Sequence, residues 1–121
     1  KEVTYHLRWS SQWGLRLGDG TTESHQRIQS AVNKLWMYAF ESLEMDELDT
    51  AMANQGVGVN LEDIKKEVIQ NVKDTLNEAT LTIPEESFIQ TGGKQGMHTE
   101  HLGFILAEMQ HMQRAYPGAK W

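Results

Sequence analysis

Apolar side chains recur at helical spacing in four long stretches of this sequence, and that pattern sets the strongest limit on the fold. The stretches cover residues 1–17, 22–43, 61–79 and 98–116. An α-helix turns about 100° per residue, so side chains three or four positions apart share one face, and an apolar face is the side that packs. Glycines at positions 18, 20, 56 and 58 and the Pro117-Gly118 pair supply stop signals. The pattern predicts an all-α protein.

The stripes and stops define helical segments with intervening loops. We predict helices from the start to Leu17, from Thr22 to Leu43, over a short stretch from Asp46 to Asn54, from Leu61 to Ala79 after an Asn60 N-cap, and from His98 to the stop at Pro117. Residues 80–84 are rich in β-branched side chains and end in proline, which predicts an extended segment. Residues 87–97 are predicted to form a loop.

The first predicted helix carries apolar residues on two sides. Tyr5, Trp9 and Trp13 recur at every fourth position and form an aromatic ridge, whereas Val3 and Leu7 lie on another side. This arrangement indicates burial against two neighbours. If those neighbours are missing, we expect this helix to leave a large apolar patch bare, and we expect the chain to self-associate.

Length, composition and charge exclude several classes of protein. The 121 residues fit a single helical domain spanning 1–121, and the start inside a helix suggests a fragment of a larger bundle. The absence of cysteine excludes a disulfide framework and a thiolate zinc site, and it fits a cytoplasmic location. The net charge of −6, with no Lys/Arg cluster, disfavours nucleic-acid binding. No apolar run approaches the length of a membrane span.

The last helix contains the residue types that bind di-iron in helical bundles. Glu108 and His111 match the Glu-x-x-His pattern of such sites. On a continuous helix, however, His111 points away from the apolar face and Glu108 lies at its edge. We interpret Glu108 as a solvated side chain and His111 as exposed, with metal ligation as the alternative. His98 and His101 are interpreted as structural residues at the helix start.

The other helices do not present a set of inward acids. The carboxylates of residues 61–79 project about 90° or more from the apolar centre. Glu2 and His6 are spaced i, i+4, and Tyr5 occupies the i+3 position that a Glu-x-x-His motif needs. His25 shares the apolar side of the second helix without an accompanying acid. We therefore predict no metal ligands, no cofactor-binding residues and no catalytic residues in this chain.

Two further motifs lack the residues that their chemistry needs. Gly92-Gly93-Lys94 resembles part of a phosphate loop, but Phe88 replaces the first glycine and Gln95 the Ser or Thr. We interpret this segment as a flexible loop in which Lys94 meets an acid of a partner. The serines at 10, 11 and 87 have no local base pattern, so a hydrolase nucleophile is unsupported. Trp121 is expected to anchor the C-terminus by packing.

Six sequence blocks resemble the C subunits of bacterial phenylacetyl-CoA epoxidases. The blocks are Tyr-His-Leu-Arg-Trp-Ser at 5–10, Ala-Val-Asn-Lys-Leu-Trp at 31–36, Asn-Glu-Ala-Thr-Leu at 77–81, Thr-Gly-Gly-Lys at 91–94, His-Thr-Glu-His-Leu-Gly at 98–103 and Leu-Ala-Glu-Met-Gln at 106–110. They span nearly the whole chain in family order. The match corresponds to the C-terminal half of such a subunit.

The resemblance implies a fold, a role and partners. It implies the C-terminal portion of a ferritin-like helical bundle that pairs with a homologous A subunit, the catalytic subunit that holds the di-iron site. It implies a structural subunit that performs no chemistry itself within a multicomponent monooxygenase, with the reductase and small subunits as further partners. Glu2-x-x-Tyr5 then resembles a decayed Glu-x-x-His motif. The alternative is a ferritin-like metal-binding oxidase or oxygenase whose remaining ligands lie in the missing N-terminal half.

Overall fold

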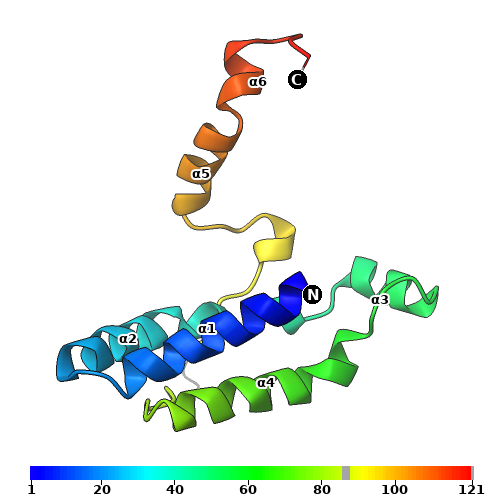
Figure 1. Cartoon of the computed structure of the whole chain (residues 1–121). Coiled ribbons are helices and arrows are strands. Elements are labelled where there is room, and N and C mark those ends of the chain that lie inside the picture. The colour runs from blue at the N-terminus through cyan, green and yellow to red at the C-terminus, as the bar shows by residue number, and fades with distance from the viewer. Residues whose placement is uncertain (86–87, 121) are drawn as a thin grey trace. The chain divides into compact units, whose positions relative to one another are not determined.

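The computed structural model describes residues 1–85 and 88–120, and every regular element within those ranges is a helix. The chain divides into two compact units, Lys1–Gln90 and Thr91–Trp121 (Figure 1). The first unit contains α1 to α4 and two short 3₁₀ turns, and the second contains a 3₁₀ turn followed by α5 and α6. The all-α prediction is confirmed. A single domain over residues 1–121 stays a prediction.

Two helices begin the first unit, and the second of them is shorter than predicted. α1 covers Glu2–Gly18, as expected, whereas α2 covers Thr22–Leu35 and gives way to the 3₁₀ turns Trp36–Tyr38 and Glu41–Leu43. The prediction of a continuous helix to Leu43 is therefore wrong.

Aromatic packing explains the early end of α2. Trp36 is 7% exposed, and the ring of Phe40 stands edge-on to it with the centroids 5.1 Å apart. Aromatic side chains lose rotamer freedom in an α-helix, so the local helical preference here is weak. The burial of Trp36 and Leu43 decides the backbone path instead.

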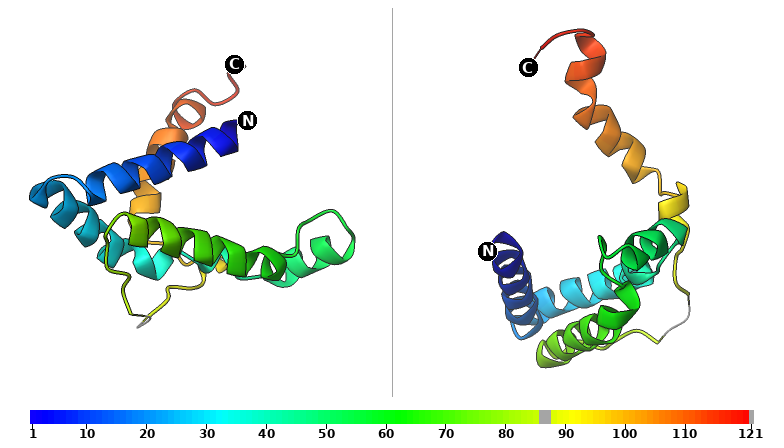
Figure 2. Two further views of the ribbon diagram at one scale, coloured as in Figure 1. Left: turned by 60° about the horizontal axis from the view of Figure 1, so that its bottom comes forward. Right: turned by 90° about the vertical axis from the view of Figure 1, so that its right-hand side faces the viewer.

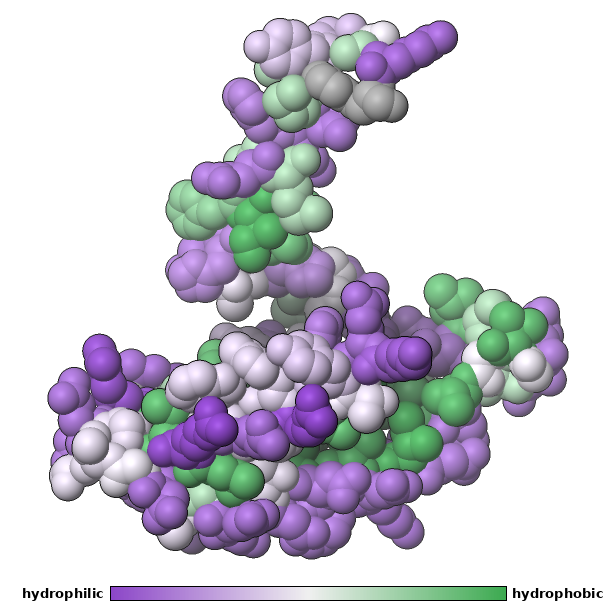
Figure 3. All heavy atoms as spheres, in the orientation of Figure 1, coloured by the Kyte–Doolittle hydropathy of each residue, from purple (hydrophilic) through white to green (hydrophobic). Residues whose placement is uncertain are grey.

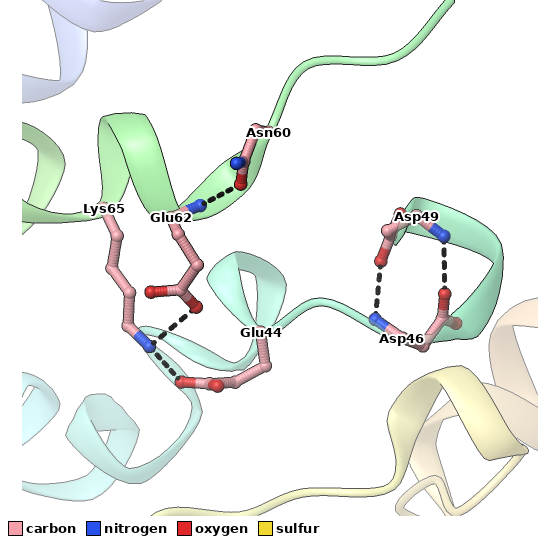
Figure 4. Close-up of polar contacts among 6 residues, drawn as sticks. All are labelled: Glu44, Asp46, Asp49, Asn60, Glu62 and Lys65. Atoms are coloured by element: carbon pink, nitrogen blue, oxygen red, sulfur yellow. Dashed lines mark hydrogen bonds and ion pairs between the residues drawn. The ribbon is translucent and has the colours of Figure 1, made fainter. Parts of the chain in front are cut away.

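Side-chain caps set the starts of the next two helices. α3 covers Glu47–Asn54, and Asp46 and Asp49 form a reciprocal capping box before it (Figure 4). α4 covers Leu61–Glu78, and the Asn60 Oδ1 accepts a 3.1 Å hydrogen bond from the Glu62 N–H. A cap of this kind satisfies one of the four free N–H groups at a helix start. The predicted bounds of both helices are confirmed to within a residue.

α4 ends in a Schellman motif, and this corrects the prediction for Thr80. The Leu81 N–H donates to the Leu76 carbonyl at 2.9 Å, and the Thr80 N–H donates to the Asn77 carbonyl at 3.0 Å. This geometry requires a left-handed residue, and Thr80 has φ +59°. Thr80 therefore belongs to the helix cap rather than to an extended segment, because satisfying the last carbonyls of α4 overrides the preference of a β-branched residue.

The core of the first unit is small. Its buried apolar residues are Trp36, Leu43, Ala79 and Leu81, and none of the described large side chains is fully buried. α1 packs against α2 and α4 in this unit (Figures 1 and 2). Gln29 of α2 holds the segment that contains Leu81: its side-chain amide donates to the Thr82 carbonyl and accepts from the Thr82 N–H, each at 2.8 Å. A small core of this kind leaves many apolar side chains at the surface.

The second unit starts its helix later than predicted and breaks it once. α5 covers His101–Met109 and α6 covers His111–Ala115, so His98 precedes the helix. No side chain caps α5; the Leu102 and Gly103 N–H groups instead bond the carbonyls three residues earlier. Gln110, with φ −94° and ψ 0°, ends α5. The prediction of one continuous helix from His98 is therefore wrong.

Candidate interaction surface

The residues considered as metal ligands lie apart from one another or at the surface. Glu2 and His6 are both exposed on α1, where the His6 ring lies against the Tyr5 ring. Glu108 and His111 are exposed and border one shallow hollow with Ala107. Over residues 1–85 and 88–120, no three His, Asp or Glu side chains come close enough to hold a metal ion. The absence of metal ligands stays a prediction.

The Glu-x-x-His pattern spans the break at Gln110. The prediction placed His111 on the far side of a continuous helix from the apolar face; in the structure Glu108 lies just before the break, His111 follows it, and both border the same hollow, as their three-residue spacing allows. They come from two different helices and have no third ligand among the described residues. His98 and His101 are exposed, and their structural role stays a prediction.

The glycine-rich loop is a closed turn. Gly92 has φ +99°, and its carbonyl accepts hydrogen bonds from the Gln95 and Met97 N–H groups, while the Gly96 N–H donates to Gly93. A phosphate loop needs its N–H groups free to face the ligand, and three of them are used here inside the turn. The segment is therefore a hydrogen-bonded turn without a phosphate loop's free N–H groups, and its flexibility stays a prediction. Lys94 already has an interaction within the structure, and its meeting with a partner's acid stays a prediction.

Two predictions remain: that the serines are not nucleophiles, and that Trp121 packs at the C-terminus. The Ser10 hydroxyl donates to the His6 carbonyl at 2.9 Å, which is a local helix contact and not a nucleophile's arrangement. Ser87 and Trp121 lie outside the described residues.

Two side chains of α2 satisfy the last carbonyls of α1. The Ser24 hydroxyl donates to the Leu17 carbonyl at 2.9 Å, and the His25 Nδ1–H donates to the Gly18 carbonyl at 2.7 Å. The last four carbonyls of a helix have no partner within it, so these contacts replace water at the end of α1. His25 is therefore a structural residue of the α1–α2 junction.

The end of α1 also packs directly against the end of α4, where the backbones of Gly18 and Ala79 meet. Gly18 is buried, and a Cβ added to it would lie 2.2 Å from the Ala79 carbonyl oxygen and 2.8 Å from the Ala79 Cβ. Ala79 itself is 0% exposed. Only a glycine permits this approach of two backbones, so Gly18 fixes where α1 leaves the surface of α4.

A small ion-pair cluster joins α4 to the second 3₁₀ turn. The Lys65 Nζ lies 2.8 Å from a Glu44 carboxylate oxygen and 3.6 Å from one of Glu62 (Figure 4). The hydrogen bond to Glu44 raises the pKa of Lys65 above its usual 10.5, the negative charges of Glu44 and Glu62 act in the same direction, and partial burial acts against them. This cluster ties the start of α4 to the residue that follows the second 3₁₀ turn.

The aromatic ridge of α1, formed by Tyr5, Trp9 and Trp13, faces solvent. These side chains are 53%, 54% and 43% exposed. The rings of Trp9 and Trp13 stand edge to face with their centroids 6.1 Å apart. Figure 3 shows near-white side chains of intermediate hydropathy along α1, crossed by purple hydrophilic ones. Val3 and Leu7 are exposed as well. The expected burial of α1 against two neighbours is therefore not found within this chain, whereas the expected bare apolar surface on both sides of α1 is.

Two arginines belong to this ridge, although the sequence pattern did not single them out. The Arg8 guanidinium lies 6.0 Å from the centroid of the Tyr5 ring, and that of Arg16 lies 5.5 Å from the Trp13 ring. These are cation–π distances. The signal was present in the sequence as a repeated spacing, aromatic-x-x-Arg, at Tyr5 to Arg8 and at Trp13 to Arg16.

The apolar face of α5 and α6 is exposed within the second unit. Ile105, Met109 and Tyr116 are 54%, 72% and 58% exposed, and Figure 3 shows hydrophobic side chains at the surface of α5. The prediction that this face is buried is wrong within this chain. A helix of this length is marginal in water without a packing partner, so the face is a second candidate contact surface.

Comparisons with known proteins extend over the whole chain. A family model described as phenylacetic acid catabolic protein matches residues 1–121. A curated protein of Escherichia coli (strain K12), the C subunit of 1,2-phenylacetyl-CoA epoxidase, is 47% identical to the chain over 121 residues. The alignment covers 100% of this chain and 49% of that protein, so the chain spans about half the length of the curated relative it matches.

Proposed function

The chain belongs to the family of phenylacetic acid catabolic proteins, which is ferritin-like, and we propose that it acts as a structural subunit of a phenylacetyl-CoA epoxidase. In this proposal it pairs with a homologous A subunit, which carries the di-iron site and the chemistry, and it takes no catalytic part itself. The reductase and small subunits of the assembly are further proposed partners.

The observation that supports this role most strongly is the placement of large apolar side chains on outward helix faces. Helix faces that carry Trp9, Trp13 and Ile105 remain exposed while the buried core is small. Exposed apolar surface of this extent marks protein contact sites. The 47% identity to a protein named as an epoxidase subunit supports the kind of assembly.

A structural subunit acts on its partner by mass action. Binding only the folded partner stabilises it by RT ln(1 + [L]/Kd), which is about 2.7 kcal/mol at a hundredfold excess over Kd. The melting temperature of the isolated A subunit should therefore rise when the full-length protein is added. An unchanged melting temperature over a wide range of concentrations would contradict the proposal.

The reconstituted epoxidase separates assembly from chemistry. His98→Ala and His101→Ala subunits are assembled with their partners, the intact complex is purified, and turnover of phenylacetyl-CoA is measured per iron. We expect a smaller yield of assembled complex and an unchanged turnover per iron site. Normal assembly with turnover abolished would place chemistry in this chain and overturn the structural role.

The alternative is a metal-binding, ferritin-like oxidase or oxygenase. The hollow that Glu108 and His111 border is the observation in its favour. Iron analysis of the full-length subunit alone distinguishes the two functions. Stoichiometric iron that survives chelation and is lost in Glu108→Ala would support the alternative, whereas we expect none.

The remaining proposals concern location and self-association. Among the described residues, no helix has the length and apolar content needed to cross a membrane. We propose a cytoplasmic location. Without a partner, the exposed apolar sides of α1 should drive self-association or bind a hydrophobic dye, which light scattering and dye fluorescence would measure.

A further inference from the structure

The 3₁₀ turns that follow α2 interrupt a sequence whose helical period continues. The apolar stripe of α2 extends at three- and four-residue spacing beyond Leu35, to Ala39 and Leu43. The structure nevertheless forms the turns Trp36–Tyr38 and Glu41–Leu43 instead of further α-helical turns. A stretch of 3₁₀ helix within a helical pattern marks a hinge or a strained segment. In this stretch, local pattern and tertiary structure therefore disagree.

The break leaves two backbone donors without a backbone acceptor. Within the part of the chain that the structure describes, no backbone hydrogen bond uses the N–H of Phe40 or of Ser42. In a continuous α-helix the Phe40 N–H would bond the Trp36 carbonyl, and the Ser42 N–H would bond that of Tyr38. Phe40 has φ −117° and ψ 0°, whereas Ala39 has α-helical angles. Phe40 therefore marks the point where the α-helical path is lost.

The Met37 carbonyl, which the next α-helical turn would use, is bonded by a distant segment. Its oxygen accepts a 2.8 Å hydrogen bond from the Gln90 N–H. In a continuous helix the same oxygen would accept from the Glu41 N–H, with the carbonyl directed along the helix axis. The two arrangements compete for the orientation of one peptide group, so the Gln90 contact favours the 3₁₀ path.

The observed path also leaves one buried side-chain donor without an acceptor. Trp36 is 7% exposed, and its Nε1–H is buried and has no hydrogen-bond partner among the residues described. A buried unpaired donor costs free energy, because it has lost water without gaining an acceptor. Tertiary contacts therefore hold residues 36–43 in place against an internal cost.

The position of Gln90 in the chain connects this segment to the second unit. Gln90 is the last residue of the first unit, and Thr91 begins the second. A displacement of the second unit that pulls on the chain therefore acts first at the residue that bonds Met37.

We propose that residues 36–43 are a two-state helix end, which forms two 3₁₀ turns while the Gln90 N–H bonds the Met37 carbonyl and continues α2 once that bond is released. The continuation adds eight residues, or about 12 Å, to α2. Movement of the second unit is thereby transmitted to the end of α2, so the fold contains a conformational switch with its trigger at Gln90.

The test measures the ratio of α to 3₁₀ conformers at Phe40 in the full-length protein. The ¹³Cα chemical shift reports the major conformer, and relaxation dispersion detects a minor one. Gln90→Pro removes the N–H donor, and loss of one hydrogen bond should raise the ratio about two- to tenfold. The matched control is Phe88→Pro, at an exposed residue whose N–H has no described backbone acceptor, and it should leave the ratio unchanged. Ala39→Gly should lower the ratio about fivefold, because glycine is a poor helix former.

Each outcome supports the switch or overturns it. Equal ratios in Gln90→Pro and Phe88→Pro would show that Gln90 does not hold the turn. An α-helical Phe40 in the wild-type full-length protein would overturn the proposal as well. If circular dichroism shows that Gln90→Pro has lost its helices, Ala39→Gly and Ser42→Ala are compared with Gln90 intact. They should move the ratio in opposite directions, about fivefold down and about twofold up, and no movement in either variant would refute a two-state segment.

Discussion

The contact between Gly18 and Ala79 leads to the sharpest stability prediction for this fold. A Cβ at position 18 would lie 2.2 Å from the Ala79 carbonyl oxygen, 2.8 Å from its Cβ and 3.0 Å from its carbonyl carbon. Two of these three atoms belong to the backbone, so no side-chain rotation relieves the overlap. Gly18→Ala therefore has to push the end of α1 away from the end of α4.

The expected magnitude follows from two opposing effects. Overpacking a tight contact costs about 1–3 kcal/mol, and here the neighbour is backbone, which places the cost at the upper end. Replacing glycine by alanine inside a helix contributes about 0.5–1 kcal/mol in the other direction. We expect Gly18→Ala to lower the free energy of unfolding by about 1–2 kcal/mol in net terms.

Gly14→Ala is the matched control on the same helix. Nothing lies within 4 Å of a Cβ added at Gly14, so this variant should gain the helical contribution alone and become more stable by about 0.5–1 kcal/mol. Urea unfolding followed by far-UV circular dichroism gives both values from the shift in midpoint at constant slope. If Gly18→Ala were as stable as Gly14→Ala, α1 and α4 could not meet at Gly18, and the reasoning would be refuted.

Three further predictions follow from individual contacts. Thr80→Gly should raise the free energy of unfolding by up to about 1 kcal/mol, because a left-handed residue with a Cβ carries a cost that glycine avoids. Thermal unfolding measures the change, and a destabilised variant would show that Thr80 is not strained at this cap. Gln29→Ala should lower stability by about 1–2 kcal/mol through loss of two hydrogen bonds to Thr82, whereas Gln26→Ala, an exposed neighbour on α2, should change it by less than about 0.5 kcal/mol. The contribution of Lys65 to stability should be fully present below pH 10.5 and should disappear as the pH rises through its raised folded-state pKa, since deprotonation ends its attraction to Glu44. The free energies of unfolding of wild type and Lys65→Met should therefore converge at alkaline pH. A difference that stays constant with pH would contradict this role of Lys65.

Helix positions were predictable because stripes and caps are local. The bounds of α1 and α4 and the Asn60 and Asp46 caps follow from residues within one or two turns. The end of α2 at Leu35 was not predictable in this way, because it depends on the burial of Trp36, a tertiary effect. The break at Gln110 was not predictable either, because no proline or glycine stands at that position.

The candidate surface was half predictable. The spacing of Tyr5, Trp9 and Trp13 defined one side of α1, but period alone does not say whether that side faces a core or solvent. The packed side was set by Gly18, which the sequence presented as a stop signal and the structure shows to be a close-contact residue. Arg8 and Arg16 needed the ring geometry before their spacing could be interpreted.

The hydrogen bond from His25 to the Gly18 carbonyl also gives this protein a spectroscopic reporter. A carbonyl can only accept, so the contact requires the proton on Nδ1 and leaves Nε2 with its lone pair. ¹⁵N shifts of the His25 ring distinguish the two neutral tautomers. A partner that docks on α1 without disturbing its junction with α2 would leave that signature unchanged, whereas one that pulls the helix away would erase it.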